Sequence, residues 1–205
     1  MSRRSRSPRA DAAVTGYLLR AGAGTLADGA HLVWSVADGR RGRRWRAVAT
    51  LDGVITHALL LEVDVTGRPS RLELSTTAGM LTLHPEEGSG GLHGNVVTGS
   101  GVRHLALPWS AEHGLEVEGR PIAAAVTAHR LSGSTGVGEG RTVPVVVITP
   151  DLLVAEATRR YTRVAAGEWQ IDDVDGGATP VVLAIDDRGV PVPAGDARAW
   201  PLELD

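Results

Sequence analysis

Three amino acids are absent from this chain of 205 residues: cysteine, lysine and phenylalanine. Without cysteine there are no disulfides, thiolate zinc sites, iron–sulfur clusters or cysteine nucleophiles. Without lysine there is no P-loop lysine, no protein-kinase strand lysine and no Schiff-base chemistry, which excludes pyridoxal phosphate enzymes. The aromatic residues are five Trp and two Tyr. Tryptophan must therefore supply much of the large volume in any core.

The remaining composition is that of a globular protein, with 42% hydrophobic and 22% charged residues. Four of the 21 basic residues lie in residues 1–9, which hold no acidic residue. Residues 10–205 contain the other 17 basic residues and all 24 acidic residues, so this part of the chain has a net charge of −7. We expect residues 1–11 to be a disordered basic arm and residues 12–205 to be a single domain. Because that domain is acidic, we expect no nucleic-acid partner.

The chain also lacks a long apolar run. Its longest apolar stretches, around residues 54–61 and 143–148, fall far short of the roughly 20 residues that a membrane-spanning helix needs. Ser2, Arg3 and Arg4 resemble a twin-arginine export signal, but Asp11 and Arg20 interrupt the segment where such a signal needs an apolar region. We therefore expect no transmembrane segment and a cytoplasmic location. The oligomeric state stays open.

Alternation of apolar and polar residues dominates from residue 31 onward, and Asp-Gly and similar turn signals separate the alternating segments. This pattern is typical of antiparallel strands with one face on a core and one in water. We predict a mainly β, single-domain protein without an internal repeat. The predicted strands cover residues 31–37, 45–51, 54–65, 70–77, 80–84, 102–107, 115–118, 142–149, 168–172 and 180–185.

Helix is scarce in this prediction. Residues 122–131 and 151–160 could each form a short helix, although the second segment fits a strand equally well. Residues 12–26 are ambiguous between a short helix and a lead-in loop. Residues 85–101 look like a mobile, glycine-rich connection that could contain a strand at 92–98.

No familiar catalytic motif is present, and we assign no catalytic residue and no cofactor. His84 and His93 are nine residues apart, as are His104 and His113. Because none of them has a close ligand-like spacing to another histidine or to a carboxylate, we predict no metal site. The pairs of adjacent acidic residues look like solvated turns rather than a tuned acid–base pair.

The most distinctive segment is RRGRRWR at residues 40–46, directly after a predicted hairpin turn. Five arginines around Trp45 could hold phosphate, carboxylate or sugar hydroxyls, with the indole as a stacking face. The alternative is a solvated, charged hairpin end. Trp45 and Trp109 are candidates to line a ligand cavity, whereas Trp34 and Trp169 lie within strand patterns and are expected in the core.

One region resembles a known family. Its segments are AHRL at 128–131, GE at 138–139, TVPVVV at 142–147, PDL at 150–152 and RYTR at 160–163. This order is similar to that of a bacterial family of glycolipid-binding proteins with a spiral β-roll fold. Trp34, Asp64 with residues 67–69, and residues 183–190 resemble further parts of that family. The likeness covers roughly residues 32–200, but only residues 130–163 are specific.

This resemblance implies a single-domain spiral β-roll, or barrel-like sheet, and a glycolipid or other amphiphilic small molecule as ligand. Carried over by position, the implied binding residues are Arg130, Tyr161 and Arg163. Residues 123–127 (AAAVT) replace the family's Pro-x-Thr-Asn-x-Leu-Pro stretch, so ligand binding could be altered here. If residues 160–163 form a strand, Tyr161 and Arg163 share one face. Otherwise Tyr161 packs in the core and Arg163 pairs with an acid such as Glu168 or Asp172.

Three functions remain open from the sequence. The first is a non-enzymatic binding protein that holds an amphiphile, which requires an apolar cavity with polar groups at its rim. The second is a small β-barrel enzyme that uses His and carboxylate chemistry, which requires such a pair inside a pocket. The third is an Arg-rich module that binds an acidic partner.

Overall fold

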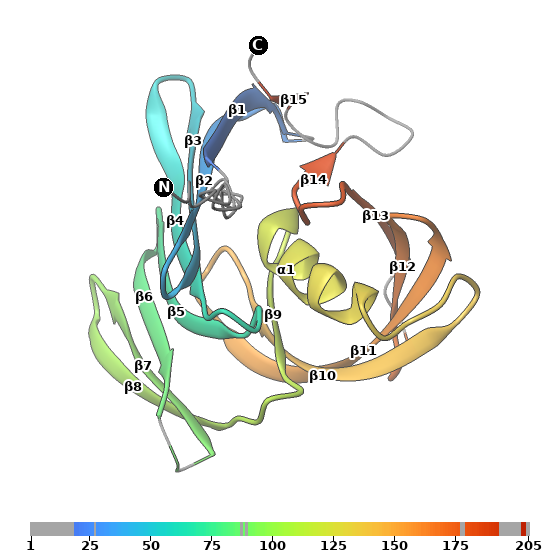
Figure 1. Cartoon of the computed structure of the whole chain (residues 1–205). Coiled ribbons are helices and arrows are strands. Elements are labelled where there is room, and N and C mark those ends of the chain that lie inside the picture. The colour runs from blue at the N-terminus through green and yellow to red at the C-terminus, as the bar shows by residue number, and fades with distance from the viewer. Residues whose placement is uncertain are drawn as a thin grey trace, which may run out of the picture.

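The computed structural model describes residues 19–26, 28–86, 88, 90–176, 179–192 and 202–203. Within these residues the protein is mainly β, with two sheets and one helix (Figure 1). The predicted fold class is therefore confirmed. The proposed basic arm, residues 1–11, lies outside the described residues.

The larger sheet has nine strands in the order β15-β1-β2-β3-β4-β5-β6-β7-β8, and every neighbouring pair is antiparallel. Along β2 to β8 the strands follow chain order as a meander, because short turns join them. Its strands are β1 (Leu19–Thr25), β2 (His31–Gly39), β3 (Gly42–Leu51), β4 (Val54–Val63), β5 (Pro69–Thr76), β6 (Gly79–Pro85), β7 (Gly91–Thr98), β8 (Gly101–Pro108) and β15 (Leu202–Glu203).

The smaller sheet has six strands in the order β14-β13-β12-β11-β10-β9, and it curls around the helix α1 (Figure 1). One pair, β9 with β10, is parallel. Parallel neighbours cannot be joined by a tight turn, and α1 forms the connection between them. The elements are β9 (Gly114–Val117), α1 (Pro121–Ser132), β10 (Gly140–Ile148), β11 (Val154–Ala165), β12 (Glu168–Asp173), β13 (Val181–Ile185) and β14 (Pro191–Val192).

Three sequence predictions need correction or refinement. The helical alternative for residues 151–160 is wrong, because β11 pairs with β10 on one side and β12 on the other. Residues 19–25 of the segment proposed as helix or loop form the strand β1, which pairs with β2 along its whole length. Residues 91–98 of the glycine-rich connection form β7, as the possible strand at 92–98 anticipated. The helix predicted at 122–131 is confirmed as α1.

The core consists of two clusters of buried side chains that meet at α1. Ile122, Ala123 and Val126 of the helix pack in the first cluster, which the larger sheet dominates. Ala125 and Ala128 pack in the second, against the concave face of the smaller sheet. The helix is therefore buried on two sides, which explains its Ala-rich sequence.

Trp34 and Trp169 are buried in the core as expected. Trp34 packs in the first cluster against Trp45, with ring centroids 6.1 Å apart. Trp169 belongs to the second cluster. The indoles thus fill the volume that phenylalanine occupies in most proteins.

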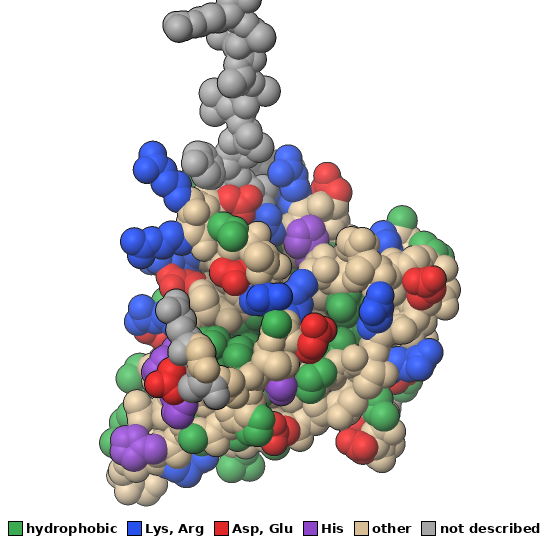
Figure 2. All heavy atoms as spheres, turned by 60° about the horizontal axis from the view of Figure 1, so that its bottom comes forward, with side chains coloured by type: hydrophobic (Ala, Val, Ile, Leu, Met, Phe, Trp, Pro, Cys, Tyr) green, Lys and Arg blue, Asp and Glu red, His purple; other side chains and the backbone are tan. Residues whose placement is uncertain are grey.

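On the face of the molecule that Figure 2 shows, arginine and acidic side chains are interspersed. No helix in the described part of the chain has the length and apolar character needed to cross a bilayer.

Candidate functional site

A groove lies where the two sheets meet, with a volume of about 800 Å³. It is lined by the β2–β3 hairpin, the β4–β5 turn, the second half of α1 and the β13–β14 turn. We call it the inter-sheet groove. Trp45, Val63 and Val126 are buried apolar residues of its lining, whereas Arg188 and Thr66 are exposed. The lining therefore combines an apolar floor with a polar rim.

The β4–β5 and β13–β14 turns that wall the groove have the same construction. Residues 64–69 (DVTGRP) and 186–191 (DDRGVP) share the pattern Asp-x-x-Gly-x-Pro. The sequence prediction of no internal repeat overlooked this short repeat, whose signal was the matching position of Asp, Gly and Pro. In each turn the first backbone N–H donates to the carbonyl of the fifth residue, 2.8 Å from Asp64 to Arg68 and 2.9 Å from Asp186 to Val190.

The aspartate side chains hold both turns closed. Asp64 Oδ1 accepts from the backbone N–H of Thr66 at 2.7 Å and of Arg68 at 3.0 Å. Asp186 Oδ1 accepts from the N–H of Arg188 and of Val190, each at 2.9 Å. Burial raises the pKa of both carboxyl groups. The side-chain hydrogen bonds from Thr66 to Asp64 and from Arg20 to Asp186, together with these backbone hydrogen bonds, lower it below the usual value.

The glycines of the two turns pack against the last turn of α1. Gly67 and Gly189 have positive φ angles of 78° and 74°. A Cβ on Gly67 would lie 3.7 Å from Arg130 Cβ, and one on Gly189 only 2.4 Å from His129 Cγ. The positive φ favours glycine at both positions, and at Gly189 the close approach to His129 also requires it. The two turns therefore contact neighbouring residues at the C-terminal end of the helix.

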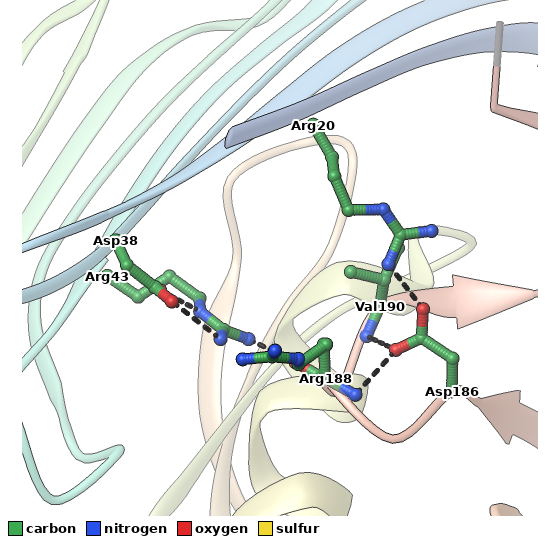
Figure 3. A network of polar contacts seen from close by, with 6 residues as sticks. All are labelled: Arg20, Asp38, Arg43, Asp186, Arg188 and Val190. Atoms are coloured by element: carbon green, nitrogen blue, oxygen red, sulfur yellow. Dashed lines mark hydrogen bonds and ion pairs between the residues drawn. The ribbon is translucent and has the colours of Figure 1, made fainter. Parts of the chain in front are cut away.

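Polar contacts also connect the larger sheet to the β13–β14 turn (Figure 3). Arg20 on β1 forms an ion pair with Asp186. Arg43 on β3 pairs with Asp38, 2.6 Å from Nε to Oδ1, and its Nη1 donates to the carbonyl of Arg188. These contacts keep the β2–β3 hairpin next to the β13–β14 turn across the groove.

His129 is the titratable ring in the groove. Burial lowers its pKa, and the positive charge of Arg43 lowers it further, while Asp186, Asp38 and Asp187 act in the opposite direction. The imidazole is thus mostly neutral at pH 7.

Arg130 lines the groove, but its guanidinium group donates hydrogen bonds to backbone carbonyls of the protein. Nη1 donates to the carbonyl of Ala111 at 2.6 Å, and Nη2 donates to those of Glu112 and His113, both at 3.0 Å. Burial lowers its pKa from the usual arginine value. Arg130 thus holds the loop between β8 and β9 in place.

Trp109 lies on that same loop and not in the groove lining. Its ring packs against His113, with centroids 5.1 Å apart, and contacts the first core cluster. His113 Nδ1 accepts from the N–H of Ser110 at 3.0 Å. Trp109 is therefore connected to Arg130 through the loop backbone.

Tyr161 and Arg163 share one face of β11, as expected of a strand, but that face is covered by α1. Tyr161 is fully buried, and its hydroxyl donates to Glu116 Oε1 at 3.0 Å. Burial and the negative charge of Glu116 raise its pKa well above the usual value. Tyr161 thus packs in the core with its hydroxyl bonded, which is the structural alternative from the sequence.

Arg163 does not pair with Glu168 or Asp172. Its Nη1 donates to the carbonyl of Ser132, the last residue of α1, at 3.2 Å and to that of Thr135, just after the helix, at 3.0 Å. The guanidinium also lies 6.0 Å from the centre of the Trp169 ring. Of the five proposed site residues, the structure brings Trp45 and Arg130 to the groove, and Tyr161 and Arg163 lie together in the other half of the core.

The histidines that are nine residues apart in the sequence do not form a metal site among the described residues. His84 on β6 and His93 on β7 are direct cross-strand neighbours, and His93 Nε2 lies 3.1 Å from Glu86 Oε2 on the surface. His104 pairs with Asn95, 2.6 Å from Nδ1 to Oδ1. Among the described residues, no group of three or more His, Asp or Glu could hold a metal ion.

Comparison with known proteins shows the fold and no more. No protein-family model and no curated protein sequence matches the chain. Its fold is similar to that of a DUF1089 family protein. The crystal structure of that protein, from Pseudomonas aeruginosa, covers 93% of this chain and 96% of its own, with a TM-score of 0.52 and 17% sequence identity.

Proposed function

We propose that this protein is a non-enzymatic binding protein that holds an amphiphile, of the glycolipid class, in the inter-sheet groove. The observation that carries the proposal is the combination of an apolar floor with a polar rim in one groove. An amphiphile would place its apolar part over Trp45, Val63 and Val126. Its polar part would then meet the two Asp-x-x-Gly-x-Pro turns.

The size of the groove supports this proposal. Its volume of about 800 Å³ lies within the range of roughly 300–1,000 Å³ that is typical of small-molecule sites. Trp45 is fully buried below the groove, so the base of the groove is apolar.

The groove gives less support to an enzyme that uses His and carboxylate chemistry. Such an enzyme requires a histidine within hydrogen-bond reach of a carboxylate in the pocket. His129 makes no hydrogen bond to a carboxylate within the described ranges, and the His93–Glu86 pair lies on the exposed surface.

Filling the groove tests the proposal. Gly133 lines it just after α1, has an ordinary helical φ of −73°, and has open space where a Cβ would lie. We expect Gly133→Trp to fold normally and to weaken binding of a fluorescent alkyl probe at least tenfold. Native mass spectrometry of the protein purified from its own host should show a bound amphiphile that this variant lacks.

Gly99 provides the matched control. It lies between β7 and β8, outside the groove lining, and also has open space at its Cβ position. Gly99→Trp should bind the probe as the unmodified protein does. Equal binding by both variants and the unmodified protein would show that the probe binds elsewhere, and the proposal would be wrong.

A further inference from the structure

The groove adjoins a second, outer hollow of about 550 Å³ along the β2–β3 hairpin. The two share part of their lining, including Asp38, Arg43 and Asp64. Together the linings contain six arginines and three carboxylates, a net charge of +3. The chain as a whole carries −3, and charges of both signs are interspersed on the face that Figure 2 shows. The excess of positive charge comes from arginines that line only one of the two hollows, because the shared lining holds Arg43 together with Asp38 and Asp64.

Three of these arginines form hydrogen bonds or ion pairs within the protein. Arg43 pairs with Asp38, and Arg44 Nε donates to Glu62 Oε1 at 2.6 Å. Arg130 donates to three backbone carbonyls. These contacts engage the charges of Asp38 and Glu62, and the third carboxylate, Asp64, accepts hydrogen bonds within its own turn.

The other three arginines are Arg40, Arg41 and Arg188. All three are exposed, and none has a side-chain hydrogen bond or ion pair within the ranges that the structure describes. Asp187 precedes Arg188 in the chain but lines neither hollow. At the mouth of the groove, Arg40 and Arg41 line the outer hollow and Arg188 lines the groove itself. Their guanidinium groups have no partner in the described part of the chain.

These arginines lie in turns of the two sheets, and a hydrogen bond connects the β2–β3 hairpin to the β13–β14 turn. Arg40 and Arg41 form the tip of the β2–β3 hairpin, and Arg188 lies in the β13–β14 turn. The hydrogen bond from Arg43 to the carbonyl of Arg188 fixes this arrangement (Figure 3). Like charges in proximity repel one another, and a bound anion removes that cost. Guanidinium groups also match the oxygens of an oxyanion in geometry.

We propose that the mouth of the inter-sheet groove binds an oxyanion, the headgroup of an anionic amphiphile such as a phosphate- or sulfate-bearing glycolipid. This proposal rests on the proposed function, since the groove would hold the apolar part of the same ligand. It assigns the headgroup to Arg40, Arg41 and Arg188, and it excludes a purely neutral sugar headgroup as the preferred ligand.

The test compares dodecyl phosphate, dodecyl maltoside and inorganic phosphate by titration calorimetry below the micellar concentration. We expect dodecyl phosphate to bind at least about tenfold more tightly than the other two. Arg40→Gln/Arg41→Gln should lose most of the preference for phosphate over maltoside, and Arg188→Gln part of it. Arg46→Gln/Arg160→Gln removes two exposed arginines that line neither hollow, and it should keep the preference.

The outcomes separate the two proposals. Equal affinity for both alkyl probes, unchanged in Arg40→Gln/Arg41→Gln, would overturn the anionic headgroup and leave amphiphile binding in place. Inorganic phosphate binding as tightly as dodecyl phosphate would support the oxyanion site but overturn the amphiphile as its ligand. Binding of none of the three probes would overturn both proposals.

Discussion

At the scale of single residues, His57 shows how burial changes a charge. It lies on β4 with only 4% of its surface exposed, and its Nε2 has no hydrogen-bond partner among the described residues. Its pKa is lowered from 6.5 to about 4, mainly by burial and also by the positive charge of Arg120, while Asp28 opposes the shift. The folded protein therefore keeps this ring neutral at pH values where the unfolded chain would protonate it.

This difference predicts a loss of stability in mild acid. Below pH 6.5 the unfolded state binds a proton at His57 that the folded state does not bind until about pH 4, so stability falls as the pH falls through this window. We expect the titration of this residue to lower the free energy of unfolding by about 3 kcal/mol between pH 7 and pH 4. The measurement is urea unfolding across that range.

His57→Gln should flatten the pH dependence, because the variant has no titrating group at this position. The matched control is His84→Gln, which replaces an exposed histidine on β6 and should keep the slope of the unmodified protein. An identical slope in His57→Gln and the unmodified protein would disprove the assignment.

At the scale of elements, the contacts between α1 and the two turns shape the groove. The turns have the same sequence pattern, yet their glycines differ in how closely they approach the helix. Gly67 has ordinary van der Waals room beside Arg130, whereas Gly189 has none beside His129. The β13–β14 turn is therefore the one that determines where the last turn of α1 lies.

Gly189→Ala should accordingly destabilise the protein for two reasons. The alanine must adopt a positive φ of 74°, which costs roughly 1–2 kcal/mol, and its Cβ must displace the His129 ring. Gly29→Ala has the first cost alone, because Gly29 has a φ of 84° and open space around it. We expect the free energy of unfolding to fall by at least about 1 kcal/mol more in Gly189→Ala than in Gly29→Ala. Equal losses of unfolding free energy in the two variants would mean that the close approach to His129 does not affect stability.

At the scale of the whole molecule, α1 packs in both core clusters and so connects the two sheets. Neighbouring helical residues pack in different clusters, Val126 in the first and Ala125 in the second. The helix cannot leave one cluster without leaving the other. The two sheets should therefore unfold together.

We expect one cooperative unfolding transition, with tryptophan fluorescence and far-UV circular dichroism changing at the same urea concentration. Val126→Ala in the first cluster and Leu183→Ala in the second should each shift this whole transition to lower urea. The expected losses are roughly 1–3 kcal/mol for the valine and 2–5 kcal/mol for the leucine. A second transition in Leu183→Ala would show that the smaller sheet unfolds by itself.

The sequence by itself determined the fold class, because alternation and turn signals depend on neighbours along the chain. It also identified α1 and the burial of Trp34 and Trp169. It left residues 151–160 open, since Val154 and its neighbours suit a helix or a strand, and pairing with β10 and β12 decided the outcome.

The candidate site was only partly visible in the sequence. Trp45 and the arginines around it were recognised from their local pattern, and Arg130 from a resemblance. Only the tertiary structure placed Arg188 opposite the β2–β3 hairpin, since the two segments are about 145 residues apart and meet through Arg43. It likewise placed Tyr161 and Arg163 under α1, because which face of a strand is covered depends on the element that packs against it.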